Sequence, residues 1–474
     1  MAAIREPGTT ARVAQWASDY RLEDAPSEVV ERIKVLILDL LRAIAVGARM
    51  PWSRAARQLA LELGGKPSSS ILLYGDRLDA VRTAFVNGVF AHAIDLDDTH
   101  VGSMLHPGAS VLPAALAVAE MADASGPELL AAVVCGYEVG LRTGLAVQPS
   151  QFHRGFMATP TCGTLAASVA AGKLLGLDAQ GLAGALGVSA SYAGGLAQFY
   201  KSGSTVKRIN AARAAEAGVQ SALLAQRGIR GPADILEGDA GFLRAFSDDH
   251  DSRRITDDLG KGYRLFEVSN KIHAGAGRLQ ATADAGLALG SEHQLLPDQI
   301  AEVEVGIPKV ILGRLTQTDP PDLQSAQMSV PFALAVSLAQ GRERGPEAGL
   351  RREDYEAGLA DPRIRELSKR VRCVIDPGIE AATGTEEVPS RVTLRLADGR
   401  VLVARVEHPR GSPSRRLRWG EIRALFRDTL EDALSPERLE QVPELVSRLD
   451  ADARPRELAA AFIARPSWLE ASSQ

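Results

Sequence analysis

The sequence contains little cysteine: three residues among 474, at positions 135, 162 and 373, without a Cys-x-x-Cys spacing. A disulfide framework and a cysteine-rich zinc site both lose support, because each needs several cysteines in a defined pattern. Glycine and proline, at 44 and 25 residues, stay well below the content of low-complexity chains. An excess of positive charge is also missing, since the net charge is -5. We therefore expect no nucleic-acid partner.

Segments typical of membrane insertion are missing as well. The N-terminus, MAAIREPG, is polar and lacks the apolar core of a signal peptide. No apolar stretch of about 18 residues is free of charge, so we expect no membrane-spanning segment. The remaining composition, 45% hydrophobic and 24% charged, is that of a folded protein of two or three domains. We expect a cytoplasmic protein.

The first half of the chain contains one helical pattern after another. From Ser27, a candidate N-cap, apolar residues recur at steps of three and four as far as Ile44. Asp79 is expected to cap a second helix. Further helical patterns cover 111–124, 128–146, 164–175, 179–190 and 211–226. Many are rich in alanine and glycine, and aromatic residues make up only 5% of the chain. We therefore expect a bundle of closely approaching helices.

The pattern changes near residue 265. Residues 300–308 and 391–396 alternate between apolar and polar, and an Asp398-Gly399 turn leads from the second segment into 401–406, which predicts a hairpin. Helical patterns cover 325–340 and 363–371, and return at 420–430 and 436–449. We predict a mostly α fold: a large all-helical domain, 1–266 plus 409–474, with an inserted smaller α+β lid domain, 267–408.

The densest polar cluster is HAIDLDDTH at 92–100, followed by His106-Pro107-Gly108. Imidazoles and carboxylates are metal ligands, although the spacing matches neither HExxH nor an EF-hand loop. The same residues suit acid–base catalysis by a histidine that an aspartate orients. A solvated acidic loop that caps the next helix is the third interpretation. The residues alone leave all three open.

Two cationic segments and a lone cysteine complete the candidates. Lys207 follows a loop with glycine and serine at the start of a helical pattern, and Lys271 lies in SNKIHAGAG at 269–277. Free N–H groups at a helix start and a nearby lysine attract carboxylate or phosphate. A P-loop is excluded, because no lysine has the required glycine spacing. Cys162 could be a nucleophile, although a cysteine among small residues more commonly serves packing.

Several segments, in this order, resemble the MmgE/PrpD family. They are AHAIDLDDTH with LHPGASVLPAALA (91–117), GYEVGLRTG (136–144), RGF with TCGTLAASVAAGKLLGL (154–177), GSTVKRINAARAAEAGV (203–219) and, less sharply, 270–277 and 326–341. The resemblance implies a helical domain with a lid, a homodimer, no metal and no organic cofactor. Position by position, it assigns Asp95, Thr99 and His106 to the site, together with Lys207 and Lys271.

This chain departs from the family pattern at several positions. Met157 replaces a histidine, and His153 lies four residues earlier. Asn210 replaces a second histidine, and Phe332 replaces a tyrosine. Ala276 stands at a polar position of the family, with His273 nearby. These changes predict a pocket that is less polar than in other members.

The resemblance and the residues together give a functional hypothesis. His106 is the expected acid–base group, oriented by Asp95. Lys207 and Lys271 are expected to clamp carboxylate oxygens.

Thr99, His153 and Asn210 are further substrate-binding candidates. We expect a cofactor-independent lyase of dehydratase type, which removes a proton α to a carboxylate of a small di- or tricarboxylate. An epimerase or isomerase, a decarboxylase and a non-catalytic carboxylate-binding homologue are the alternatives.

Overall fold

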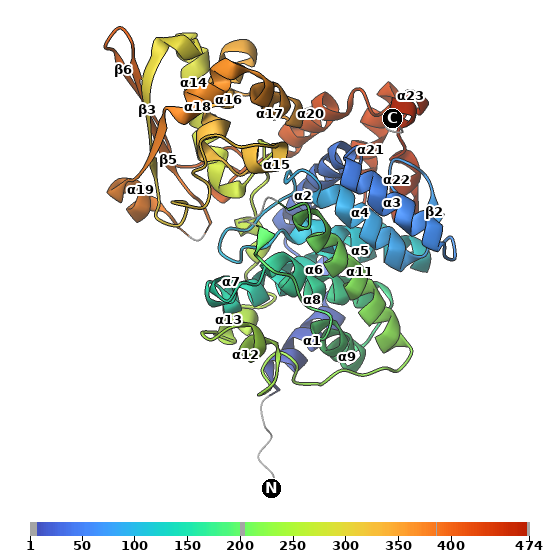
Figure 1. The fold of residues 1–474 in the computed structure, drawn as a ribbon. Helices are drawn as coiled ribbons and strands as arrows, with labels where there is room; N and C mark the ends of the chain where they lie inside the picture. Colours follow the sequence, from blue (N-terminus) through green and yellow to red (C-terminus); the bar gives the residue numbers. More distant parts are fainter. Residues whose placement is uncertain (1–6, 200–203, 385, 472–474) are drawn as a thin grey trace.

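The computed structural model describes residues 7–199, 204–384 and 386–471. Within these ranges the fold is mostly α, with a small α+β part beside a larger helical body, which confirms the predicted fold class (Figure 1). The helices of the body are α1 (Thr9–Asp19), α2 (Ser27–Gly47), α3 (Pro51–Leu63), α4 (Ala80–His92), α5 (Pro107–Ala122), α6 (Gly126–Val147), α7 (Ser150–His153), α8 (Ala158–Leu174), α9 (Ala179–Ala190), α11 (Lys207–Gln226), α12 (Phe242–Phe246) and α13 (Arg253–Thr256). A two-stranded ladder joins β1 (Ser69–Ser70) to β2 (Arg77–Leu78).

The predicted helices of the first half are present, but α5, α8 and α11 begin at least four residues earlier than expected. α5 starts at Pro107 and α8 at Ala158, with Pro160 in its first turn. Proline is tolerated there because the first N–H groups of a helix have no partner within it. Asp79 caps α4 as predicted, and its carboxylate accepts the backbone N–H groups of residues 81 and 82.

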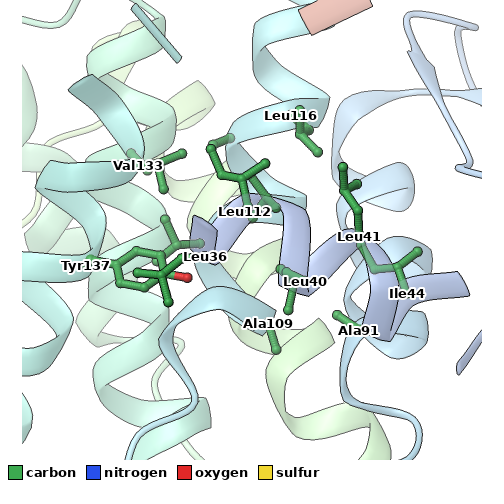
Figure 2. Close-up of a cluster of buried hydrophobic side chains, with 14 of the residues drawn as sticks. Leu36, Leu40, Leu41, Ile44, Ala91, Ala109, Leu112, Leu116, Val133 and Tyr137 are labelled. Carbon is green, nitrogen blue, oxygen red and sulfur yellow. The ribbon is translucent and has the colours of Figure 1, made fainter. Parts of the chain in front are cut away.

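Small residues bring the central helices close together. A Cβ atom added to Gly218 of α11 would lie 2.5 Å from the Cβ of Ala167 in α8, and one added to Gly88 of α4 would lie 2.7 Å from the Cα of Ala212 in α11. Leu36, in the centre of α2, lies in the surrounding core (Figure 2). α4 and α11 are thus fixed against each other, and with them the candidate site residue Lys207 at the start of α11.

α6 is a long and apolar helix. Judged by length and hydropathy alone, this helix could cross a membrane, but 94% of its most apolar window is buried inside the structure. It carries a buried ion pair between Arg142 and Glu138, with Nε and Oε2 2.9 Å apart. α6 is therefore a core helix of the body.

The α+β part contains α14 (Gln280–His293), β3 (Ile300–Ile307), α15 (Leu323–Ala326), α16 (Val330–Arg344), α17 (Arg352–Ala360), α18 (Pro362–Lys369), β4 (Val371–Ile375), α19 (Pro377–Ala382), β5 (Ser390–Leu396) and β6 (Val401–Val406). The sheet has the order β4-β3-β5-β6, with β4 parallel and β5 antiparallel to β3. The predicted β5–β6 hairpin is confirmed. The predicted helix over 363–371 is too long, because its last residue belongs to β4.

The chain then returns to the helical body. α20 (Trp419–Leu430), α21 (Pro436–Ser447), α22 (Pro455–Ala461) and α23 (Pro466–Ala471) follow, and Figure 1 shows them beside α2–α4. One hydrophobic core extends from Val13 to Ala274 and resumes at Leu417, whereas a second core occupies 276–396. The domain boundaries at 267 and 408 stay predictions.

Candidate active site

The site is built on the loop between α4 and α5. Asp95 follows the end of α4 with φ of +59°, a left-handed conformation that aspartate tolerates better than most residues. His106 stands directly before Pro107, the first residue of α5. Thr99 and Ser269 exchange backbone hydrogen bonds of 3.0 and 2.8 Å, which tie the loop to the segment that enters the α+β part.

Asp95 is the centre of a buried ion cluster. Its Oδ2 lies 2.5 Å from Nζ of Lys207, the first residue of α11. Its Oδ1 lies 2.8 Å from Nζ of Lys271, which also donates to the Asp95 carbonyl at 2.6 Å. All three side chains are at least 98% buried. One carboxylate thus joins two ammonium groups from distant parts of the chain.

The charges in this cluster shift one another's pKa values. Burial raises the pKa of Asp95, but the Lys207 and Lys271 ammonium groups outweigh this effect and hold it well below its usual range. Burial lowers the pKa of Lys207 to about 8, although Asp95 acts in the opposite direction. Lys207 is therefore a cation at neutral pH and loses its proton as the pH passes its pKa of about 8.

His106 is oriented from one side. Its Nδ1 lies 3.0 Å from the Asp98 carbonyl oxygen and 3.3 Å from Oδ2 of Asp97, whereas Nε2 lies 3.8 Å from Oδ1 of Asp95. An Nδ1–H that donates to Asp98 leaves the Nε2 lone pair available. The role of Asp95 in orienting His106 stays a prediction, and the closer contacts to the ring come from Asp97 and Asp98.

His92 completes the polar cluster. Its Nδ1 lies 2.8 Å from Oδ2 of Asp97, and its ring meets that of His106 edge-on at 4.8 Å between centroids. Burial lowers the pKa of His92 to about 4, so the ring is neutral near pH 7. Asp97, by contrast, stays ionised, because the two histidines overcome the effect of burial and lower its pKa.

This cluster also meets the size requirement of a metal site. The ligand atoms of His92, Asp95, Asp97 and His106 lie within 4.8 Å of one another, and their types suit several transition metals. However, both Asp95 oxygens contact ammonium groups, whose charge opposes a second cation at the same place. We retain the metal-free interpretation as a prediction.

The ion cluster borders a cavity of about 640 Å³. Asp95, Thr99, His106 and Lys207 line its inner part, so four predicted site residues face one space. His153 also lines the cavity, but as an exposed residue at the rim.

Two predicted substrate-binding residues do not fit this arrangement. Within the described ranges, the cavity lining includes neither Lys271 nor Asn210. Lys271 is fully buried behind Asp95, so its ammonium group fixes that carboxylate rather than presenting itself to a ligand. Asn210 is buried on α11, and its Nδ2 has no hydrogen-bond partner among the described residues. The predicted direct contacts of both residues with substrate stay predictions, which this cavity lining does not support.

The positions that depart from the family pattern lie in different places. Met157 and Ala276 line the cavity, as an apolar pocket requires. Phe332 is buried in the second core, 6.5 Å from the Tyr355 ring between centroids. His273 bonds to Asp284 at 2.9 Å instead of reaching the cavity.

Cys162 does not behave as a nucleophile in this structure. The thiol is buried in α8, and burial raises its pKa to about 12. Within the described ranges, it is not part of the cavity lining. The packing role, which the sequence analysis favoured, agrees with this position.

Sequence reasoning missed several residues of the cavity wall. Arg278, which is half-buried, adds a positive charge to the cavity wall one residue beyond the SNKIHAGAG segment. The sequence also offered no reason to assign apolar residues to the cavity wall, because apolar residues occur in any core. The wall includes Met104, Val310, Leu315 and Met328.

Comparison with known proteins identifies the relationship. The MmgE/PrpD N-terminal domain matches residues 11–255, and the MmgE/PrpD C-terminal domain matches residues 273–451. The chain belongs to the MmgE/PrpD family. The family resemblance predicted from the sequence is thereby confirmed.

Full-length relatives in the MmgE/PrpD family have names that specify a reaction. The cis-aconitate decarboxylase of Aspergillus terreus is 28% identical over 470 residues, covering 94% of this chain and 93% of that protein. The cis-aconitate decarboxylase-like protein oryM of Aspergillus oryzae (strain ATCC 42149 / RIB 40) is 27% identical over 482 residues, covering 96% and 97%. The cis-aconitate decarboxylase of Homo sapiens is 27% identical over 445 residues, covering 89% and 88%. These matches indicate an enzyme of the MmgE/PrpD type.

Proposed function

We propose that the protein is a lyase that decarboxylates a small unsaturated di- or tricarboxylate without a cofactor. The observation that carries this proposal is the convergence of His106, Lys207 and Asp95 on one cavity. A carbanion-forming reaction needs a proton carrier at the reacting carbon and fixed positive charge nearby. His106 supplies the first requirement and Lys207 the second.

The charge balance of the cluster favours an anionic substrate. The ammonium groups of Lys207 and Lys271 face the carboxylates of Asp95 and Asp97, and the proton that His106 must carry in the proposed reaction adds a further positive charge. Lys207 is the ammonium group that lines the cavity, so a substrate carboxylate can share it with Asp95. Thr99 and Arg278 also line the cavity, and in this proposal they bind further oxygen atoms of the substrate.

The carbon–carbon bond to the departing carboxylate breaks and carbon dioxide leaves, while the electron pair moves into the adjacent unsaturated carboxylate system. His106 then donates its Nε2 proton to the resulting carbanion and regains one from water. Lys207 stabilises negative charge on the remaining carboxylate, which increases as the bond breaks.

Decarboxylation is preferred to the dehydratase reaction because the relatives above are named decarboxylases. Dehydration remains an alternative for the same residues. In that case neutral His106 would take the α-proton, and Lys207, with its pKa of about 8, would protonate the leaving hydroxyl group. An epimerase would return the proton to the opposite face of the carbanion.

One experiment separates these reactions. The purified protein is incubated with cis-aconitate and with saturated, hydroxylated and amino di- and tricarboxylates, and products are followed by ¹H NMR with parallel detection of carbon dioxide. Release of carbon dioxide supports the proposal. Water exchange at a double bond would instead establish a dehydratase, and inversion alone an epimerase. Binding without any turnover would establish a carboxylate-binding homologue.

The assembly and location inferred from the sequence also stay proposals. We propose a homodimer in the cytoplasm. Light scattering coupled to size-exclusion chromatography tests the first part: a mass near twice 50.3 kDa supports it, and a mass near 50.3 kDa contradicts it.

A further inference from the structure

The cavity changes in character between its inner end and its rim. At the inner end the polar side chains of Asp95, Thr99 and Lys207 are more than 90% buried. The rim contains Leu196, which is 63% exposed, and Phe152, whose ring lies 4.9 Å from the guanidinium carbon of Arg314. The remaining lining combines apolar side chains with polar ones, among them those of His100, Arg154 and Gln198.

The apolar part of the wall comes from both parts of the fold. It is formed by Val101, Met104, Met157, Val310, Leu315 and Met328. Carboxylate or hydroxyl groups placed against such side chains would lose hydration without gaining hydrogen bonds. This stretch is suited to hydrocarbon.

The size of the cavity leads to the same conclusion. A volume of about 640 Å³ lies within the roughly 300–1,000 Å³ typical of sites for drug-sized ligands. A six-carbon tricarboxylate held at Lys207 and Arg278 would occupy the inner part and leave the apolar stretch filled with water. Displacing that water with hydrocarbon is favourable.

We infer that the preferred substrate is a di- or tricarboxylate that bears an apolar side chain of about three to six carbons. This inference rests on the proposed function. The carboxylates bind at the inner end beside Lys207, and the side chain extends past Met157 and Met328 toward Leu196. Met157 has a particular part in this preference, since its buried apolar thioether lines the cavity at the position where the family pattern has a histidine.

The test is a series of cis-unsaturated tricarboxylates that differ in one substituent, which is hydrogen, methyl, propyl or pentyl. The substituent is attached to a carbon that takes no part in the carbon–carbon bond broken during decarboxylation. We expect kcat/KM to rise by roughly four-fold per added methylene over the first carbons. The inference is overturned if the unsubstituted compound has the highest kcat/KM, although the proposed function would then stand. If no compound releases carbon dioxide, the proposed reaction fails and this substrate preference fails with it.

Two variants test the wall directly. Met328→Gln preserves side-chain length but adds an amide, and it should lower the ratio of kcat/KM for the propyl compound to that for the unsubstituted one by about ten-fold. Leu312→Asn is the control, because Leu312 is an apolar residue that is 45% exposed and is not part of the described cavity lining. An equal ratio in Met328→Gln, the control and the wild-type protein would contradict the inference.

Binding provides a readout that does not depend on turnover. Saturated analogues of the same series are titrated by isothermal calorimetry. Affinity that increases with chain length in the wild-type protein, and less so in Met328→Gln, supports the inference. Affinity that is flat or decreases with chain length overturns it.

Discussion

Replacing Asp95 by asparagine removes the carboxylate between two buried ammonium groups. Lys207 and Lys271 lie 2.5 and 2.8 Å from its oxygens, and both lysine side chains are at least 98% buried. Removing one partner of a buried ion pair costs about 3–5 kcal/mol, because the remaining charge is left uncompensated. We expect Asp95→Asn to lose at least about 3 kcal/mol of unfolding free energy at pH 6.

The pH dependence of this loss identifies its cause. Asp95 raises the pKa of Lys207, which burial has lowered to about 8, so the variant's Lys207 should titrate below 8. The unfolded chain, with a lysine pKa of about 10.4, binds more protons than the folded variant above that point. Stability of the variant therefore rises with pH, and its deficit relative to wild type shrinks between pH 6 and 8.

Urea unfolding of both proteins at pH 6, 7 and 8, followed by circular dichroism, measures the deficit. Asp432→Asn is the matched control. Asp432 pairs with Arg49 at 2.8 Å, but its side chain is 58% exposed, so its loss should cost only about 0–1 kcal/mol. A deficit for Asp95→Asn that is below 1 kcal/mol or constant from pH 6 to 8 would refute the reasoning.

Three further predictions concern protons, thiols and metals. The kcat/KM of the wild-type protein should fall above pH 8 as Lys207 loses its charge, and any activity left in Lys207→Arg should lack this limb, because a guanidinium stays protonated; a shared limb would contradict the role of Lys207. Iodoacetamide at pH 8 should leave Cys135 and Cys162 unmodified in the native protein, since burial raises both thiol pKa values to about 12; rapid labelling seen by mass spectrometry would show that the core opens. Dialysis against EDTA should leave turnover unchanged, and a loss that Mn²⁺ or Zn²⁺ restores would assign the cluster around His92 to a metal.

Long periodic patterns made most of the helical body predictable. The three- and four-residue spacing of apolar residues in α2 agrees with a helix buried on several sides, and Asp79 caps α4 as its position indicates. β4 was missed because its five residues follow α18 after a single residue, with no turn signal between them. The helix predicted over 325–340 is interrupted, since Ser329 caps a new helix at Val330.

The sequence made it possible to predict which residues form the site, but not the directions in which their side chains point. The cluster at 92–100 and the two cationic segments indicated which side chains meet. The sequence could not show that Lys271 points toward Asp95, 176 residues away, and therefore lies behind the cavity wall. Nor could it show that His106 turns Nδ1 to the backbone carbonyl of Asp98. Such directions depend on tertiary packing.

Solvent deuterium tests the central claim most directly, namely that His106 moves a proton at a substrate carbon beside Lys207. The reaction with cis-aconitate or the best compound of the series is run in D₂O and followed by ¹H NMR. His106→Asn retains an amide that can reach the Asp98 carbonyl and a good helix N-cap, and His293→Asn at the end of α14 is the control. We predict one deuteron at carbon for each molecule of product, and a rate about 10²–10⁴-fold lower in His106→Asn alone. Product without carbon-bound deuterium, or full activity in His106→Asn, would contradict the account.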